Sequence, residues 1–253
     1  MEHYRFSAAR RCVLMIKTEK IEYQDGDVLL EGFFAYNGQT TGKLPAILVC
    51  HDWSGKNAFA CDKAEQLAKL GYAGFALDMY GKGKTGNTKE EKAALMQPLI
   101  DDRTKLQQRI LAAFDTVKNL APVDSKRIGA IGFCFGGLCV LDLARSGADV
   151  RAVVSFHGLL HAPDTLAQPS IKAKILALHG YDDPMVTPEK VTAFCNEMTH
   201  AGADWQLDMY GHTMHAFTNP QANDPGFGTV YNEKADMRSW AAMREFFKEV
   251  FEI

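Results

Sequence analysis

Apolar runs recur along the chain, separated by segments with helical spacing. Residues 45–50, 72–77 and 128–133 are continuous apolar runs, and residues 150–157 and 174–180 are also predicted to be strands. A run that is apolar at every position is typical of a strand buried on both faces, as in a parallel sheet. By contrast, residues 17–36 alternate charged and apolar positions around the turn Asp25-Gly26-Asp27. The pattern therefore predicts an antiparallel hairpin followed by a mostly parallel sheet.

Apolar residues at intervals of three and four predict helices between these strands. The predicted helices cover 58–70, 89–119, 188–201 and 235–251, and the second is expected to break near Pro98. A further strand is predicted over 205–210, a turn over 122–127, and mostly irregular chain over 211–234. Strands that alternate with helices indicate a doubly wound α/β fold. We expect a single α/β domain over residues 1–253, with residues 1–16 as an N-terminal extension in which Met15 is an alternative start to Met1.

Composition and charge narrow the classes of function. The 253 residues are 47% hydrophobic and 23% charged, with a formal net charge of -3, and they lack the basic excess of a nucleic-acid-binding surface. No apolar run approaches the roughly 18 residues of a membrane span. The short apolar stretch at 12–16 is followed at once by charged residues, which argues against a signal for export. We expect a cytoplasmic protein, a monomer or a small homo-oligomer, that binds neither nucleic acid nor membrane.

The six cysteines show no metal-binding or disulfide pattern. They are Cys12, Cys50, Cys61, Cys134, Cys139 and Cys195. None forms a C-x-x-C pair, and their spacing fits neither a zinc site nor a dense disulfide framework. A reduced protein without metal or organic cofactor is the simplest interpretation. Cys50, Cys139 and Cys195 lie in apolar contexts and are expected in the core.

The stretch IGAIGFCFGGLCV at 128–140 combines a short strand, a tight turn and the start of a helix. Its turn has the pattern G-x-C-x-G-G, with Cys134 at the centre. This is the arrangement of a nucleophile elbow with cysteine where serine is commoner. Small flanking residues let strand and helix pack closely, and the helix N-terminus favours a thiolate, the reactive form of cysteine. The alternative is that Cys134 is a small apolar residue in a crowded turn.

The strands that follow lead into an acid and a histidine that such a nucleophile needs. Asp182 and Asp183 follow one predicted strand, and His212 and His215 follow the next. The order nucleophile, acid, histidine is that of α/β-hydrolases, whose chemistry lies at the carboxyl ends of strands. Asp183 is favoured because Asp182 suits a solvent-facing or turn-capping role. His215 is favoured over His212 because the apolar pair after it can pack its loop towards the elbow.

The loop at 51–55 is expected to complete the site, since it directly follows a buried strand. The backbone N–H groups of Phe135 and Trp53 are expected to form an oxyanion hole. Asp52 has two interpretations between which the spacing does not decide. Its carboxylate holds or accepts the proton of the Cys134 thiol, or it caps the following turn.

Two further residues at strand ends are candidates for contact with substrate. They are His157, which ends the strand at 150–157, and Tyr80, in the loop after the strand at 72–77. His179 also lies near the end of a strand, but there a buried, hydrogen-bonded core residue is the expected role.

With these residues identified, the chain closely resembles the dienelactone hydrolase family of α/β-hydrolases over nearly all of 17–251. The resemblance rests on GFCFGG at 132–137, HGYDDPMV at 179–186, HAF at 215–217 and HDWSGKN at 51–57. It implies an α/β-hydrolase fold without a large cap domain. It also implies a catalytic triad of Cys134, Asp183 and His215.

Two positions depart from the family pattern. The family has a glutamate in the 51–57 loop that contacts the nucleophile, and Asp52, one methylene shorter, occupies that position. Members that act on dienelactone hold its carboxylate with arginines, one of them four residues after the triad histidine, where this chain has Asn219. Lys82 or Lys84 is the expected source of positive charge, the alternative being that both are solvated. The resemblance therefore implies an ester or lactone substrate but does not extend to dienelactone itself.

The expected function is hydrolysis of a carboxylic ester or lactone through a thioacyl-enzyme intermediate. His215, oriented by Asp183, is expected to take the proton of Cys134, whose thiolate then attacks the carbonyl. Thioesterase, peptidase and phosphotriesterase activities on the same triad are alternatives, because the elbow does not define the acyl group. Two other classes are a thiol redox or sensor protein, with Cys139 as the resolving cysteine, and a catalytically silent interaction protein.

Overall fold

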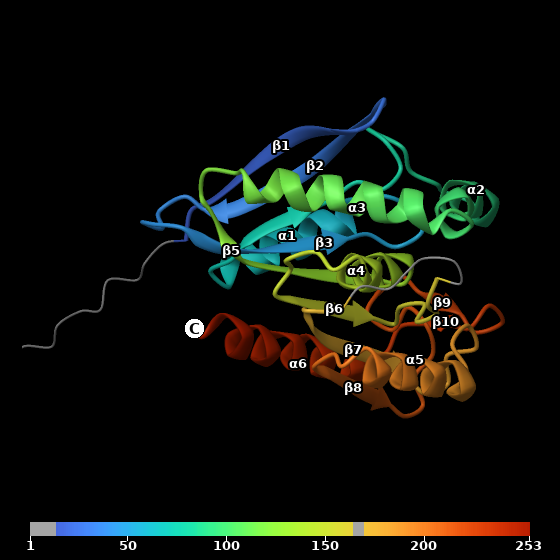
Figure 1. Cartoon of the computed structure of the whole chain (residues 1–253). Helices are drawn as coiled ribbons and strands as arrows, with labels where there is room; N and C mark the ends of the chain where they lie inside the picture. Colours follow the sequence, from blue (N-terminus) through green and yellow to red (C-terminus); the bar gives the residue numbers. More distant parts are fainter. Residues whose placement is uncertain (1–13, 164–169) are drawn as a thin grey trace, which may run out of the picture.

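Strands and helices alternate along the chain in the computed structural model, which describes residues 14–163 and 170–253 (Figure 1). Cys12 and nearly all of the expected N-terminal extension lie outside the described residues. The strands are β1 (Ile16–Asp25), β2 (Val28–Asn37), β3 (Leu44–Cys50), β4 (Ala73–Ala76), β5 (Val123–Phe133), β6 (Ala152–Phe156), β7 (Lys174–Gly180), β8 (Trp205–Tyr210), β9 (Asn223–Asp224) and β10 (Thr229–Val230). The helices are α1 (Ala58–Lys69), α2 (Lys89–Ile100), α3 (Arg103–Lys118), α4 (Phe135–Arg145), α5 (Pro188–His200) and α6 (Glu233–Phe251).

Eight of these strands form one sheet in the order β1-β2-β4-β3-β5-β6-β7-β8. β1 pairs antiparallel with β2, and β2 with β4, whereas all neighbours from β4 to β8 are parallel. Ile47, Leu48 and Val49 on the central strand β3 are inaccessible to solvent because both faces of the sheet are covered. The predicted antiparallel start and doubly wound parallel sheet are confirmed.

Helices cover both faces of the sheet (Figure 1). On one face, Leu67 of α1 and Phe247 of α6 share a core cluster with the side chains of the sheet. On the other, Leu106, Leu138 and Phe194 of α3, α4 and α5 belong to a second cluster. Within the described ranges, no large cap domain stands over the carboxyl ends of the strands. These ends are therefore left open for a site.

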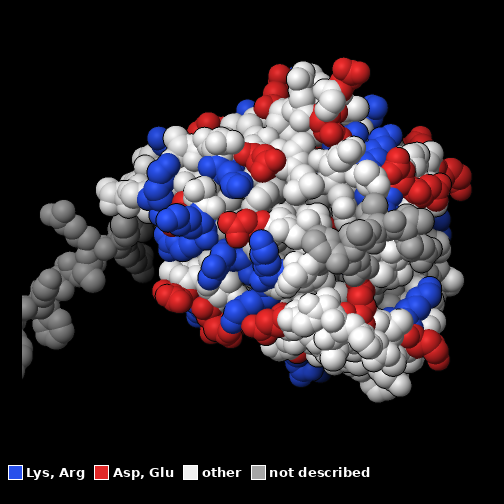
Figure 2. Space-filling view, viewed as in Figure 1, with Lys and Arg blue, Asp and Glu red and all other residues white. Residues whose placement is uncertain are grey.

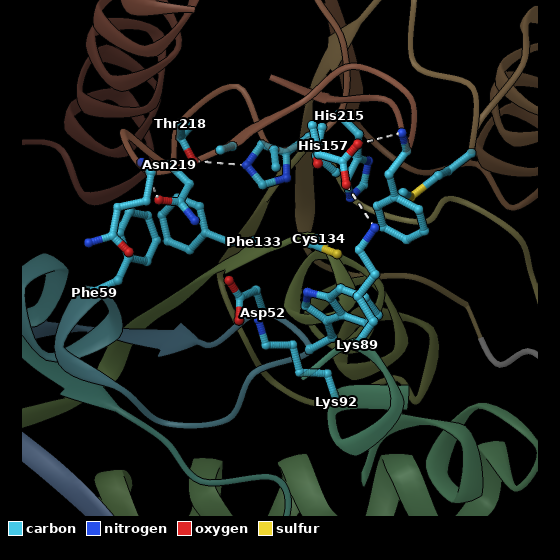
Figure 3. Close-up of a pocket in the computed structure, with 18 of the residues that line it drawn as sticks. Asp52, Phe59, Lys89, Lys92, Phe133, Cys134, His157, His215, Thr218 and Asn219 are labelled. Carbon is cyan, nitrogen blue, oxygen red and sulfur yellow. Dashed lines mark hydrogen bonds and ion pairs between the residues drawn. The ribbon is translucent and has the colours of Figure 1, made fainter. Parts of the chain in front are cut away.

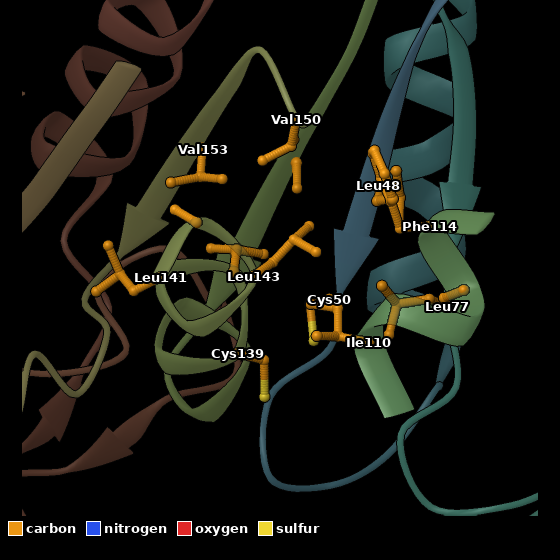
Figure 4. Close-up of a cluster of buried hydrophobic side chains, with 14 of the residues drawn as sticks. Leu48, Cys50, Leu77, Ile110, Phe114, Cys139, Leu141, Leu143, Val150 and Val153 are labelled. Carbon is orange, nitrogen blue, oxygen red and sulfur yellow. The ribbon is translucent and has the colours of Figure 1, made fainter. Parts of the chain in front are cut away.

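The second cluster includes two cysteines behind the elbow (Figure 4). Cys50 ends β3 and Cys139 lies on α4, and both are fully buried, as expected. Cys195 is half-buried and packs against the same cluster. Cys139 thus serves as a small apolar residue of the core.

The helical segment predicted over 89–119 is in two pieces, as expected. α2 continues through Pro98 to Ile100, and the break lies at Asp101 and Asp102, the second of which caps α3. The start of the next strand was predicted wrongly. The predicted turn at 122–127 is part of β5. Its ladder passes from Val123 opposite Leu44 directly to Ile128 opposite Ala46. The polar residues between them bulge out of the strand, which gave the segment the composition of a turn.

A buried ion network ties α4 to its surroundings. Asp142 on α4 is inaccessible and accepts two hydrogen bonds from Arg103 on α3, each of 2.6 Å. It also accepts one of 3.2 Å from Arg145, whose guanidinium pairs with Glu197 on α5 at 2.7 Å. Arg145 donates further to the carbonyl of Leu160 at 2.9 Å. The network therefore fixes α4, the helix that begins at the elbow, against α3, α5 and the loop after β6.

We expect Asp142→Ala to lower the free energy of unfolding by about 3–5 kcal/mol, because two buried guanidinium groups lose their shared carboxylate. Asp115→Ala, at an exposed position of α3, is the control and should change it by less than about 0.5 kcal/mol. Urea unfolding of both variants measures the difference. Equal midpoints for Asp142→Ala and wild type would show that the network does not stabilise the fold.

The surface carries charges of both signs. On the face shown in Figure 2, basic side chains gather on one side with acidic side chains among and around them. That face therefore lacks a continuous surface of one charge. No helix in the described ranges is long and apolar enough to cross a membrane.

Candidate active site

Cys134 lies at a sharp turn between β5 and α4. Its backbone has φ 55° and ψ -116°, a left-handed conformation that a residue with a side chain adopts only under constraint. A Cβ added at Gly132 would meet the carbonyl of Gly136, and one added at Gly136 would meet the carbonyl of Cys50. The glycines therefore allow the close approach of strand and helix that lifts the Cys134 side chain out of the sheet. The geometry of a nucleophile elbow is present.

Asp183 and His215 form a buried pair, and His215 lines the same pocket as Cys134 (Figure 3). Nδ1 of His215 lies 2.7 Å from Oδ2 of Asp183. The alternatives, Asp182 and His212, are exposed, and their nearest atoms are 4.0 Å apart. The structure thus brings together the three residues favoured from the sequence and leaves the two alternatives at the surface.

The His215 ring lies between two acidic groups. Its Nδ1–H is donated to Asp183, whose other carboxylate oxygen accepts the Met185 N–H at 2.8 Å. Its Nε2 is buried without a hydrogen bond of ordinary geometry to any described residue, and Cys134 lines the same pocket. Burial disfavours the imidazolium, but the Cys134 and Asp183 side chains outweigh burial and raise the pKa of His215 to about 10. The site therefore stabilises a proton on His215.

A short hairpin holds the backbone of His215 in place. The N–H of His215 donates to the carbonyl of Gly228 at 2.9 Å, and its own carbonyl accepts from Val230 at 3.1 Å. The hairpin is formed by β9 and β10, and Phe227 at its tip stacks on Trp53 with ring centroids 5.6 Å apart. This hairpin could not be predicted from the sequence, because two-residue strands are too short to show an alternating pattern.

Asp52 caps the turn that follows it. One oxygen of its carboxylate accepts from both the N–H (2.8 Å) and the hydroxyl (2.6 Å) of Ser54. Asp52 also lines the pocket of Cys134, but no hydrogen bond joins the two among the described residues. Of the two interpretations of Asp52, the structure thus shows the cap directly. To affect the Cys134 thiol, the Asp52 carboxylate would have to act from across the pocket.

The expected oxyanion-hole donors come from the elbow itself and from the loop after β3. Phe135 is the first residue of α4, so its N–H has no partner within the helix. The N–H of Trp53 likewise donates to no acceptor in the part of the chain that the structure describes. The Tyr80 hydroxyl donates to the carbonyl of Trp53 at 3.0 Å and so holds this loop in place. Both N–H groups are therefore available to a substrate oxygen.

His51 fixes the same loop from beneath. It is buried, with Nε2 accepting the N–H of Met79 at 3.1 Å and Nδ1 2.6 Å from the carbonyl of Asp52. Because Nε2 accepts, the proton lies on Nδ1 and the ring is neutral. Burial lowers the pKa of His51 below its usual value, against the opposing effect of the Asp52 carbonyl.

Because the buried His51 ring stays neutral in the folded protein, the stability of the protein should depend on pH. Below about pH 6.5 the unfolded chain binds a proton at His51 and the folded chain does not, so stability should fall by up to about 1.4 kcal/mol per pH unit for this group. Urea unfolding at about pH 7 and pH 5.5 should show a smaller loss for His51→Gln than for wild type, by about 1 kcal/mol. The buried His157 and His179, whose pKa values burial also lowers, are common to both proteins. Equal losses would contradict a neutral His51.

A pocket of about 400 Å³ opens above Cys134 (Figure 3). His157 and Asn219 line it, as expected for candidate substrate contacts. Its apolar walls come from several elements and comprise Trp53, Phe59, Met96, Phe133, Leu159, Met185 and Phe227. Nε2 of His157 is 2.8 Å from the hydroxyl of Thr218, and burial keeps the pKa of His157 well below its usual value.

The positive charges of the pocket differ from those expected. Lys82 forms an ion pair with Glu22, Lys84 is exposed in its loop, and neither lines the pocket. Instead the pocket is lined by Lys89 and Lys92, which sequence reasoning missed. The sequence carries one sign of this arrangement: the two lysines are three residues apart at the start of a predicted helix, which places both on one face.

Tyr80 is also not in the pocket. It is buried behind the elbow, where its ring stacks on Phe135 with centroids 5.8 Å apart. Through its bond to the Trp53 carbonyl it positions the loop and does not reach the substrate space.

In the described ranges, no group of three or more His, Cys, Asp or Glu side chains is arranged to hold a metal ion.

The sheet order and the elbow at the end of β5 define the α/β-hydrolase fold, and solved structures share it. The crystal structure of a dienelactone hydrolase-like promiscuous phosphotriesterase from metagenomic libraries is 34% identical, with a TM-score of 0.87 over 93% of this chain and 98% of that chain. A structure titled m3DLH is 37% identical, with a TM-score of 0.86 and the same coverage. A Bradyrhizobium sp protein named "Probable 2-oxo-3-(5-oxofuran-2-ylidene)propanoate lactonase" is 31% identical over 189 residues, 70% of this chain and 75% of its own length. The model of the dienelactone hydrolase family matches residues 30–251. The chain belongs to this family and is a hydrolase.

Proposed function

We propose that the protein hydrolyses carboxylic esters or lactones with Cys134 as nucleophile. The observation that carries this proposal is the buried bond of 2.7 Å between Asp183 and His215, whose free Nε2 shares a pocket with the strained Cys134. A nucleophile, a base and an orienting acid are the parts of a triad. The lactonase name of the Bradyrhizobium relative supports an ester or lactone as the substrate.

The proposed reaction is acyl transfer in two steps. His215, held by Asp183, takes the proton of Cys134, and the thiolate attacks the carbonyl carbon. The N–H groups of Phe135 and Trp53 stabilise the oxyanion, each contributing roughly 3–4 kcal/mol in related sites. His215 then gives its proton to the departing alcohol, and water activated by His215 releases the acid from the thioester.

The pocket supports an acyl group that is largely apolar. Aromatic and sulfur-containing side chains surround Cys134, and the ammonium of Lys89 is already paired with Asp224 at 2.7 Å. Lys92 lies over the Trp53 ring at 5.6 Å and forms no ion pair among the described residues. One unpaired ammonium, in a pocket that Asn219 also lines, is a weaker carboxylate site than the arginines of family members that act on dienelactone. Dienelactone itself is therefore not proposed as the substrate.

A second candidate activity is hydrolysis of phosphotriesters on the same triad. The similar solved structure described as a promiscuous phosphotriesterase favours it. A phosphotriester is neutral and has an oxygen that the same two N–H groups would stabilise. We expect this activity to be the weaker of the two.

A panel of aryl esters, lactones, thioesters and phosphotriesters, assayed with the purified protein, tests the proposal. We expect kcat/KM to be highest for an ester or lactone with a small apolar acyl group. Absence of turnover with every ester and lactone would contradict the proposed function.

A further inference from the structure

A second pocket, of about 560 Å³, adjoins the pocket of Cys134. Side chains that line both pockets include Asp52, Phe59, Lys92 and Asn219. Cys134 and His215 line only the first. A molecule that reacts at Cys134 therefore has room to extend past these shared residues into the second pocket, which we call the polar annex.

The polar annex is the more polar of the two pockets. The first pocket combines polar residues with several aromatic rings and methionines, whereas the annex has one aromatic ring, Phe59, and amides and hydroxyls that include Asn57, Thr85 and Asn87. The Asn57 oxygen caps α1 by accepting the Ala60 N–H at 3.3 Å. The amide NH₂ groups of Asn57 and Asn87 donate to no described residue. The annex thus presents free donors together with acceptors.

Charge in the annex does not select an anion. Its ammonium is that of Lys92, and two carboxylates, Asp52 and Asp62, line the same space. A negatively charged group would meet both carboxylates as well as the ammonium. A neutral group with several hydroxyls suits the lining better, because each hydroxyl both donates and accepts a hydrogen bond. The ring of Phe59 offers an apolar surface to the carbon atoms of such a group.

We infer that the substrate is an ester of a compact, largely apolar acid with a neutral polyhydroxylated alcohol, such as a sugar or glycerol unit, and that the alcohol occupies the polar annex. This inference rests on the proposed function. The acyl group stays on Cys134 through both steps, so it belongs in the apolar pocket around the sulfur. The alcohol leaves after the first step, when its bond to the acyl carbon breaks and it takes the proton of His215. Thr85, Asn87 and Asp62 are exposed, so the alcohol departs directly into water.

Two acetates with the same acyl group test this assignment. Released acetate is measured with monoacetylated glucose and with ethyl acetate, and each kcat/KM is divided by the rate constant of the ester with hydroxide. We expect the corrected value to be at least about tenfold higher for the sugar ester, which corresponds to one or two net hydrogen bonds.

Substitutions in the polar annex test whether its residues cause the preference for the sugar ester. Asn87→Ala and Asp62→Ala, which change residues of the annex that do not line the first pocket, should each lower the sugar-to-ethyl ratio about three- to tenfold. Asn119→Ala and Asp115→Ala are the matched controls: both residues are exposed at the end or on the surface of α3 and line neither pocket. They should leave the ratio at its wild-type value.

The outcomes separate this inference from the proposed function. Turnover of ethyl acetate with a corrected ratio near one, or annex variants that lower both rates equally, would overturn the annex as the alcohol site and leave the proposed function standing. Failure to hydrolyse either acetate and also an activated aryl ester would overturn both.

Discussion

Replacement of Cys134 by alanine is expected to reduce hydrolysis of an activated aryl ester to the background rate. The loss of a nucleophile removes the covalent route altogether, and in related triads it lowers kcat by roughly 10⁴–10⁶-fold. Alanine keeps the Cβ that the strained turn at φ 55° already accommodates, so the fold should be retained. Initial rates of p-nitrophenyl acetate hydrolysis measure the effect.

Cys195→Ala is the matched control for this experiment. Cys195 is also free and partly buried, but it lies on α5 and does not line the pocket. It should retain nearly full activity. Comparable turnover by Cys134→Ala and wild type would refute Cys134 as the nucleophile.

Replacement of His215 by glutamine is the second change with a large expected effect. Glutamine can still donate one hydrogen bond to Asp183, but it cannot take the thiol proton or return it to the alcohol. We expect kcat/KM for the aryl ester to fall by roughly 10⁴–10⁶-fold, as for loss of the nucleophile, because the members of a triad act as a unit. The pH dependence of the remaining rate should also change, because the imidazole that accepts and returns the proton is gone.

His212→Gln supplies the control for the choice of histidine. His212 is fully exposed three residues earlier in the same loop, and its nearest acid, Asp182, is 4.0 Å away. Its replacement should change kcat/KM by less than about twofold. A large loss from His212→Gln with little loss from His215→Gln would reverse the assignment of the base.

The arrangement of the fold was predictable from the sequence because its strongest signals are local. Apolar runs such as 45–50 arise because a strand covered on both faces tolerates few polar side chains. The elbow was predictable for a related reason. Gly132 and Gly136 are demanded by contacts of backbone with backbone, and only a residue without a side chain fits them. Cys134, Asp183 and His215 each follow a strand, and a parallel sheet brings such positions together at one edge.

The residues around the triad were harder to predict, because their positions depend on contacts between distant loops. Lys82 was a candidate for the pocket, but Glu22 on β1, 60 residues earlier, holds its ammonium elsewhere. Lys89 and Lys92 reach the pocket because α2 packs beside a hairpin more than a hundred residues later, to which Lys89 is bound through Asp224. Tyr80 follows a strand end, as substrate-binding residues do, yet it packs beneath the loop. No local pattern distinguishes these outcomes.

Asp52 stands at a position where the sequence allows two roles, capping of a turn and contact with the Cys134 thiol. Its carboxylate stands where the family has a glutamate, and its shorter side chain is engaged by the N–H and hydroxyl of Ser54. The sequence left capping and thiol contact as equal interpretations, because both require an acid at that position. The hydrogen bonds to Ser54 settle where the carboxylate rests.

In the proposed mechanism Cys134 carries the acyl group during turnover. Mass spectrometry of the protein mixed with excess activated aryl ester and quenched rapidly in acid, followed by peptide mapping, measures this directly. We expect a mass increase of one acyl group on the peptide that contains Cys134, absent from the Cys134→Ala variant. An acyl group on another residue, formed by both proteins while Cys134→Ala still turns over the ester, would contradict it.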